Sequence, residues 1–216
     1  MKTSRLARRI PVRALGLSAT VTMLVTAALV TPAAAASPTQ QSPNAHAAKG
    51  KLDWGVKESF RDYIEGPVAQ GHIDVFKPAI RKADGTFRYS KGKGSIDVEA
   101  DTADVGFKGR VFFTGHGGAL ELWVSKPRLQ LDGDDGILLV DTASRSSKTG
   151  KITTRTDVEF ASLDLTGVDL EANAKDLVKA TDIPAELTED GASYFGGFYA
   201  AGTALDPVSF RVLVTG

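Results

Sequence analysis

One histidine of this sequence stands among glycines in a segment that is otherwise typical of a β-hairpin. His116 lies in Thr114-Gly115-His116-Gly117-Gly118, between two β-rich apolar runs within Gly109–Val124. Glycine tolerates positive φ and lets another group approach the backbone closely, so the sequence predicts a bend that presents the imidazole with little shielding. Such a histidine could contact a ligand or act as a base. A solvated histidine at a flexible hairpin tip is the alternative.

A tyrosine near the start of the folded region is the second candidate for chemistry. Apolar side chains recur at roughly helical spacing from Leu52 to Ile64, which predicts a helix with Asp53 as its N-cap and Gly66-Pro67 as its end. Tyr63 would then lie in the last turn on the apolar side, with its hydroxyl able to point into whatever lies beneath. An amphipathic tyrosine at the edge of a core has the same pattern.

The residue inventory restricts the chemistry that these two side chains could perform. The sequence contains no cysteine, no GxSxG or HExxH motif, no P-loop and no GxGxxG after a strand. Thiolate metal sites and covalent haem attachment are therefore excluded, whereas a Ser-His-Asp triad around His116 stays open. A single iron held by a tyrosine phenolate with a histidine nearby also remains, because tyrosine is an axial ligand of ferric haem in some proteins. A phenol with a pKa of about 10 needs such a cation and a hydrogen bond to ionise.

The N-terminal segment has the pattern of a secretory signal peptide, with a basic start, an apolar stretch and small residues before Ala36. We therefore assign residues 1–36 to a signal peptide, 37–50 to a disordered linker and 51–216 to one folded domain. Without the five basic residues of the signal, the chain has 21 basic and 26 acidic side chains. This acidic balance argues against nucleic acid as a partner, and no later apolar run predicts a membrane span.

The remaining pattern predicts a mainly β, antiparallel, sandwich-like single domain with a helix near its N-terminus and another in its last third. The last third contains a weak helix or surface excursion over Val168–Ala180 and a helix that begins after Thr188 as N-cap and ends at Gly202. The Asp132–Gly136 turn lacks the Glu of a calcium loop and is interpreted as a solvated hairpin turn. Strands are expected at 72–76, 86–89, 95–100, 128–131, 137–141, 153–165 and 208–214, with Gly92-Lys93-Gly94 as a turn.

Three separate motifs resemble one known domain family. Trp54–Ile64, Phe113–Gly118 and Phe198–Gly202, the last followed by Leu205–Phe210, look like the HtaA haem-transport-associated domain, which occurs in exported and surface proteins of actinobacteria. The motifs occur in the right order and span essentially the whole expected domain. The resemblance implies a haem-binding, β-sandwich-like fold with its helices packed at the haem site.

The resemblance also implies roles for three residues. Tyr63 would be the axial ligand of a non-covalent, ferric, b-type haem, His116 would hydrogen-bond the Tyr63 oxygen and favour the phenolate, and Tyr199 would belong to the same pocket. The implied protein is an exported, non-enzymatic haem carrier that captures or relays haem for iron uptake, with other haem-uptake proteins at the cell surface as partners. The alternatives are a secreted adhesive domain that binds cell-wall polymer or protein without haem, and a hydrolase that uses His116.

Overall fold

The computed structural model describes residues 46–146 and 148–215. The expected signal peptide lies outside the described residues. The first strand, β1, begins at His46 and therefore extends into the segment that the sequence assigns to the linker.

The domain consists of one large antiparallel sheet and a few short helices, as the sequence predicts. The central hairpin is confirmed as β6 (Arg110–Gly115), a 3₁₀ turn (His116–Gly118) and β7 (Leu120–Asp132). The remaining elements are β1 (His46–Trp54), α1 (Glu58–Glu65), β2 (His72–Phe76), β3 (Ile80–Arg81), β4 (Phe87–Asp97), β5 (Thr102–Lys108), β8 (Asp135–Arg145), β9 (Ile152–Asp164), β10 (Leu177–Ile183), β11 (Ala185–Leu187), α2 (Glu189–Tyr194) and β12 (Val208–Thr215).

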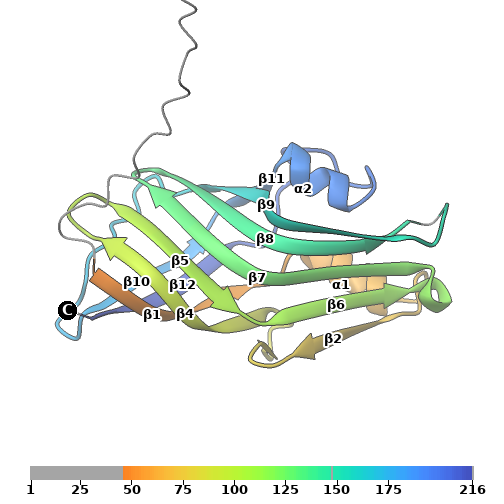
Figure 1. The fold of residues 1–216 in the computed structure, drawn as a ribbon, viewed down its shortest axis with the longest axis horizontal. Coiled ribbons are helices and arrows are strands. Elements are labelled where there is room, and N and C mark those ends of the chain that lie inside the picture. The colour runs from red at the N-terminus through yellow and green to blue at the C-terminus, as the bar shows by residue number, and fades with distance from the viewer. Residues whose placement is uncertain (1–45, 147, 216) are drawn as a thin grey trace, which may run out of the picture. The chain divides into compact units, whose positions relative to one another are not determined.

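The sheet curls until its two ends almost meet. The strand order is β10-β12-β1-β4-β5-β7-β8-β9-β11, and β10 and β11 are separated along the chain only by Pro184. One continuous segment therefore pairs with β12 at one end of the order and with β9 at the other, which gives a nearly closed, barrel-like sheet (Figure 1). In that view α1 lies behind β6 and β7, and α2 lies beside β9.

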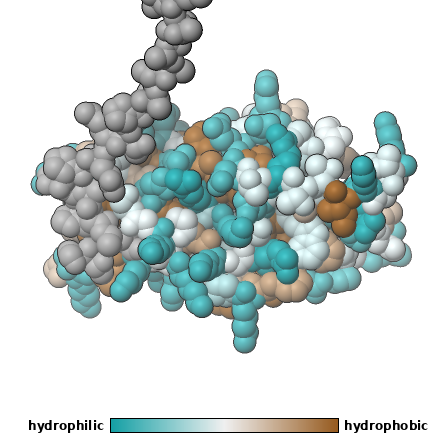
Figure 2. Space-filling model, viewed as in Figure 1, coloured by the Kyte–Doolittle hydropathy of each residue, from teal (hydrophilic) through white to brown (hydrophobic). Residues whose placement is uncertain are grey.

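Alternation along the strands divides the side chains between a core and a solvated face. In β5 and β6 every second residue is buried, as expected for strands with one face in water, and β7 alternates in the same way on either side of an irregularity at Ser125 and Lys126. The core includes the fully buried rings of Trp54, Phe87, Tyr89, Phe113 and Phe160. On the outer face, polar side chains predominate and apolar ones are scattered (Figure 2).

The first helix is shorter than predicted, and the assignment of Asp53 as its N-cap is wrong. Residues 52–54 belong to β1, which pairs with β4 on one side and with β12 on the other, and this pairing overrides their helical spacing. The two carboxylate oxygens of Asp53 each accept a hydrogen bond from the guanidinium of Arg88. The backbone N–H of Glu58 instead donates to the carboxylate of Asp206, 2.7 Å away. A residue 148 positions along the chain thus caps α1.

Two further expectations are corrected by pairing between strands. Gly92-Lys93-Gly94 is not a turn but part of β4. A Cβ at Gly94 would lie 1.9 Å from the backbone oxygen of Asp104 in β5, so the close approach of the two strands requires glycine at this position. The end of the 168–180 segment is not helical but enters β10, where Val178 and Ala180 are buried and pair with β12.

The second helix begins where the sequence predicts and ends early. Thr188 caps α2 by accepting a hydrogen bond from the backbone N–H of Gly191, which confirms that prediction. The helix ends at Tyr194, and Gly196 and Gly197 follow with φ of 64° and 81°. These left-handed conformations cannot continue an α-helix, so Gly202 is not its C-cap.

Candidate functional site

Helix α1 is fixed from both of its faces, which determines where Tyr63 points. Phe60 is buried and its ring lies 5.1 Å from that of Phe113 and 5.2 Å from that of Phe195, by centroids. The buried guanidinium of Arg61 donates to the backbone oxygen of Gly55 at 2.7 Å and to the carboxylate of Asp206. Tyr63, in the last turn of α1, is therefore half-buried at a defined edge of the core.

The hairpin that carries His116 is fixed against the segment that follows α1. The backbone N–H of His116 donates to the oxygen of Ala69 at 2.7 Å, and β2 pairs with β6 up to Thr114. A Cβ at Gly71 would lie 1.7 Å from the oxygen of Thr114, so this approach requires glycine. His116 itself takes a φ of 54° and is exposed, as the glycines around it predict.

The structure brings the two candidate residues into direct contact. The Tyr63 hydroxyl lies 2.6 Å from Nε2 of His116, and their ring centroids are 5.9 Å apart. Within the described part of the chain, the side-chain hydrogen bond of His116 is made to this phenol. A phenol paired with an imidazole can serve as an anionic oxygen ligand, because a donated hydrogen bond favours the charged form.

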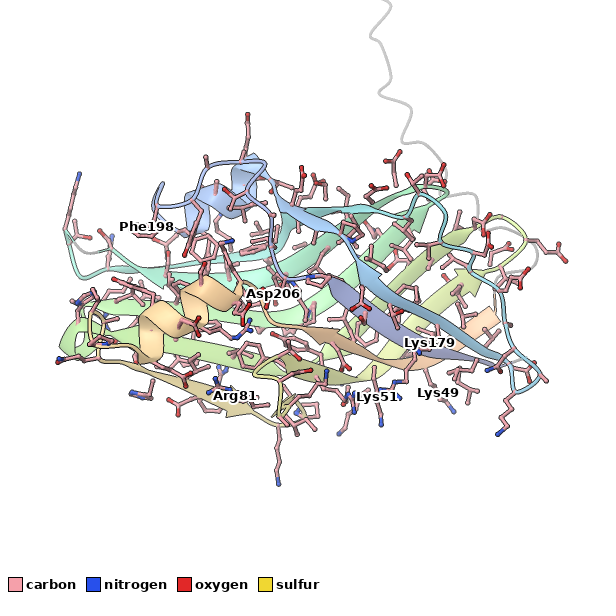
Figure 3. The ribbon with its side chains drawn as sticks, turned by 180° about the vertical axis from the view of Figure 1, so that it is seen from behind. Lys49, Lys51, Arg81, Lys179, Phe198 and Asp206 are labelled. Atoms are coloured by element: carbon pink, nitrogen blue, oxygen red, sulfur yellow. The ribbon has the colours of Figure 1, made fainter. Side chains whose placement is uncertain are left out.

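Tyr199 belongs to the aromatic cluster beside this pair rather than to the pair itself. Its ring lies 5.0 Å from that of Phe195 and 5.2 Å from that of Phe198. Phe198, labelled in Figure 3, is 72% exposed. Its ring stacks over that of Tyr63 at 6.1 Å between centroids, with an interplanar angle of 27°. The loop after α2 thus places two rings next to the Tyr63–His116 pair.

A cleft of about 520 Å³ opens beside His116. Its cationic members are Arg145, which pairs with Glu121 at 2.8 Å, and Lys148, for which the described residues provide no ion pair. The hydroxyl of Tyr194 is buried there without a hydrogen-bond partner among the described residues. Burial, and in second place the neighbouring Tyr89, raises the pKa of Tyr194 well above its usual value. The lining residues are His116, Ala119, Leu120, Glu121, Leu122, Ser144, Arg145, Ser146, Lys148, Ser193, Tyr194, Phe195 and Gly196.

The other sequence features lie apart from this cleft. His72, on β2, is exposed and contacts Thr114 and Asp74. Asp132–Gly136 forms the connection between β7 and β8. Across the described residues, no group of three or more His, Cys, Asp or Glu side chains is placed to hold a metal ion. The helices described there are too short or too polar to span a bilayer.

The chain is similar to several solved structures from Corynebacterium glutamicum. It is 28% identical to the C-terminal domain of HtaA, with a TM-score of 0.70 over 79% of this chain and 99% of that one. For the N-terminal domain of HtaA the identity is 27% and the TM-score 0.64, over 79% and 99% of the two chains. For the haem-binding protein HtaB the values are 28% and 0.62, over 78% and 94%. No curated protein matches it by sequence.

The HtaA family model matches residues 49–211, which include nearly the whole sheet and both helices. The match covers the three motifs around Tyr63, His116 and Tyr199. The chain therefore belongs to the HtaA family.

Proposed function

We propose that this domain binds ferric haem beside Tyr63 and His116 and carries it as an exported protein without catalysing a reaction. The observation that supports this most directly is the 2.6 Å contact between the Tyr63 hydroxyl and Nε2 of His116 at the edge of an aromatic cluster. The resemblance to HtaB, whose structure is described as that of a haem-binding protein, points the same way.

The residues of the site fit the chemistry of ferric haem. Haem would supply a ferric iron that prefers a hard, anionic axial ligand, and a phenolate is such a ligand. Tyr63 would bind the iron through its oxygen. Nε2 of His116 would donate a hydrogen bond to that oxygen and so favour the phenolate over the phenol. In this proposal His116 positions the Tyr63 oxygen and stabilises its charged form. His116 does not bind the iron itself.

The surroundings of the pair suit a flat, mostly apolar molecule with charged edges. Phe198 and Tyr199 present aromatic surface next to Tyr63, and aromatic side chains line most sites for such ligands. Lys148 and Arg145, at the cleft beside His116, are the cations that we assign to the carboxylates of the propionate groups. Lys148 is the stronger candidate because Arg145 already pairs with Glu121.

The carrier role is inferred from the exposed position of the site. The side chain of His116 contacts the phenol of Tyr63, and His116 itself is exposed. A ligand held at an exposed rim is accessible to a second protein, which suits capture of haem from one protein and delivery to another.

An absorption titration with hemin tests the proposal. The wild-type protein should give a one-to-one Soret shift with a high-spin ferric spectrum, and Tyr63→Phe, which keeps the ring and removes the oxygen, should lose it. Tyr89→Phe is the matched control, because that hydroxyl is buried in the core and its removal should leave the spectrum unchanged. A wild-type protein that gives no shift would rule out the haem function and favour an adhesive domain.

A further inference from the structure

A second hollow, of about 710 Å³, lies on the outer face of the sheet and away from the Tyr63–His116 pair. It crosses the strands β6 to β9, and we call it the outer groove. Its lining residues are Phe76, Lys77, Lys108, Gly109, Arg110, Trp123, Ser125, Lys126, Asp141, Thr142, Ala143, Thr154 and Thr156. None of them lines the cleft beside His116.

Side-chain size explains why the outer face is hollow here. The strand register places Phe112, Trp123, Ala143 and Thr154 in one row across β6, β7, β8 and β9. The rings of Phe112 and Trp123 stack at 3.7 Å, whereas their neighbours on β8 and β9 are small. The step from two large rings to a methyl group and a threonine leaves space beside Trp123.

Arg110 is held rigidly in this groove without an ionic partner. Its guanidinium lies 4.5 Å from the ring centroid of Phe76 and 4.5 Å from that of Trp123. Among the described residues no carboxylate or carbonyl accepts a hydrogen bond from its side chain, although every other arginine there either pairs with a carboxylate or lies next to one. Stacking orients the planar guanidinium and leaves its N–H donors available. A guanidinium held in this way can bind a carboxylate through two parallel hydrogen bonds.

The charge around Arg110 is positive although the domain as a whole is acidic. Lys77 and Lys108 line the groove, and no described residue forms an ion pair with either of them. The one carboxylate of the groove, Asp141, is already satisfied: it pairs with Lys126 at 2.7 Å and accepts a hydrogen bond from the backbone N–H of Asp157. An anionic ligand would therefore meet three free cations and no free carboxylate.

We propose that the outer groove binds an acidic oligosaccharide, with a carboxylate of a uronic acid on Arg110 and a sugar ring in the hollow beside Trp123. The volume is in the range of small-ligand sites, which is about 300–1,000 Å³. The hydroxyls of Ser125, Thr154 and Thr156 provide the donors and acceptors that sugar hydroxyls need. The apolar edge of Trp123 and the Ala143 methyl provide the surface on which a sugar ring packs.

The strand arrangement favours a sugar over an acidic peptide. β6, β7 and β8 are each paired on both sides, so their backbone groups are used within the sheet and cannot bind an extended peptide strand. Across these three strands, recognition in the groove must rely on side chains. A guanidinium fork, hydroxyls and the edge of one aromatic ring match an acidic sugar in each of these respects.

Calorimetric titration with trigalacturonate tests the proposal, with neutral maltotriose as the ligand control. The wild-type protein should bind trigalacturonate at one saturable site and bind maltotriose at least about tenfold more weakly, since the charge-assisted hydrogen bonds to Arg110 are lost. The groove contains one of the two tryptophans of the sequence, and the other, Trp54, is fully buried. Saturation should therefore also change the tryptophan fluorescence.

Three variants distinguish the groove from general attraction to a basic surface. Arg110→Lys keeps the charge and removes the fork, and Ala143→Phe fills the hollow from an outward-facing position; each should weaken binding about tenfold or more. Lys179→Ala is the matched control and should bind as the wild type does; Lys179, labelled in Figure 3, lies on β10 and pairs across the strands with Arg211 of β12.

Several results would overturn the assignment. These are no binding of trigalacturonate by the wild type, equal binding of maltotriose, unchanged binding by Arg110→Lys and Ala143→Phe, or loss of binding in Lys179→Ala. Tighter binding of a hexaglutamate peptide through Arg110 would assign the groove to an acidic protein segment instead. Tyr63→Phe should leave sugar binding unchanged, so failure of this proposal and failure of the haem proposal are separable.

Discussion

The hydroxyl of Tyr63 and Nε2 of His116 lie 2.6 Å apart although 53 positions separate the two residues in the chain. Neither the helix nor the hairpin establishes this distance alone. Phe60 and Arg61 fix α1 against the core, and the hydrogen bond from the His116 N–H to Ala69 fixes the hairpin against the segment after α1. The predictions below address the contact and then the elements that hold it.

Replacing His116 should weaken haem binding without abolishing the tyrosine ligation that we propose. His116→Ala removes a hydrogen bond to a charged oxygen, which contributes about 1.5–3 kcal/mol, so the rate of hemin loss should rise about tenfold to a hundredfold. Transfer of haem from the loaded protein to an excess of apomyoglobin measures that rate. Equal rates for His116→Ala and the wild type would show that the imidazole does not support the phenolate.

Arg61 should be the residue of α1 whose loss destabilises the domain most. Its guanidinium is 5% exposed and pairs with Asp206, so Arg61→Met leaves a largely buried carboxylate without its cation. We expect the free energy of unfolding, measured with urea, to fall by about 3–5 kcal/mol. Adding Asp206→Asn should recover part of this loss, because the amide oxygen can still cap Glu58 and the unpaired charge is gone. A loss below about 1 kcal/mol in the single variant would contradict the buried pair as an anchor.

Gly71→Ala should destabilise the domain, whereas the same change at Gly106 should have no effect. A methyl group at Gly71 would meet the backbone oxygen of Thr114 at 1.7 Å, whereas at Gly106 the nearest heavy atom would be 4.0 Å away. Gly71→Ala should therefore push β2 away from β6, lower the free energy of unfolding by about 1–3 kcal/mol or more and weaken haem binding through His116. Gly106→Ala should change neither quantity. Calorimetric unfolding and hemin titration of both variants compare them directly, and equal behaviour would exclude the close approach as the cause.

The two buried tyrosines should make the domain sensitive to alkaline pH. Burial raises the pKa of Tyr89 and that of Tyr194 far above the usual value, and each hydroxyl lacks a hydrogen-bond partner among the described residues. Only the unfolded chain then releases these protons near pH 10, so stability should be flat below that pH and fall above it by about 1.4 kcal/mol per pH unit for each tyrosine.

Tyr89→Phe should remove one of these two contributions. Urea unfolding between pH 7 and 11 should show a shallower decline for the variant than for the wild type. At pH 7 the variant should be as stable as the wild type or slightly more so, because it no longer buries an unpaired hydroxyl. A decline as steep as that of the wild type would indicate that Tyr89 ionises in the folded protein as readily as in the unfolded chain.

Local signals in the sequence predicted those elements whose geometry is determined by nearby residues. The glycines around His116 predicted its bend, and Thr188 predicted the start of α2, because a turn or a cap depends on a few neighbours. Asp53 and residues 177–180 were misassigned because both lie in strands whose partners are thirty or more positions away. Gly94 was taken for a turn because a glycine required by a neighbouring strand has the same sequence signal as a glycine required by a bend.

The same distinction applies to the site. Tyr63, His116 and Tyr199 were found through motifs that resemble a family, and the structure shows how closely the first two approach; their roles at haem stay predictions. Lys148 and Arg145 had no signal of their own, because a cation at the end of a strand or in the polar turn that follows it is ordinary in any protein. They line the cleft because β7 pairs with both β6 and β8, which places the end of β8 at the same end of the sheet as His116.

The position of β12 has a consequence for how this domain can form. The last strand of the chain lies between β1 and β10, and it contributes seven residue pairs to β1. Until residues 208–215 are available, the first strand has only β4 as a neighbour and β10 has no sheet to join. A chain that is still being synthesised, or that is still crossing a pore, can therefore form the β6–β9 meander but cannot complete the sheet. The complete sheet should appear in one late step that requires residues 208–215.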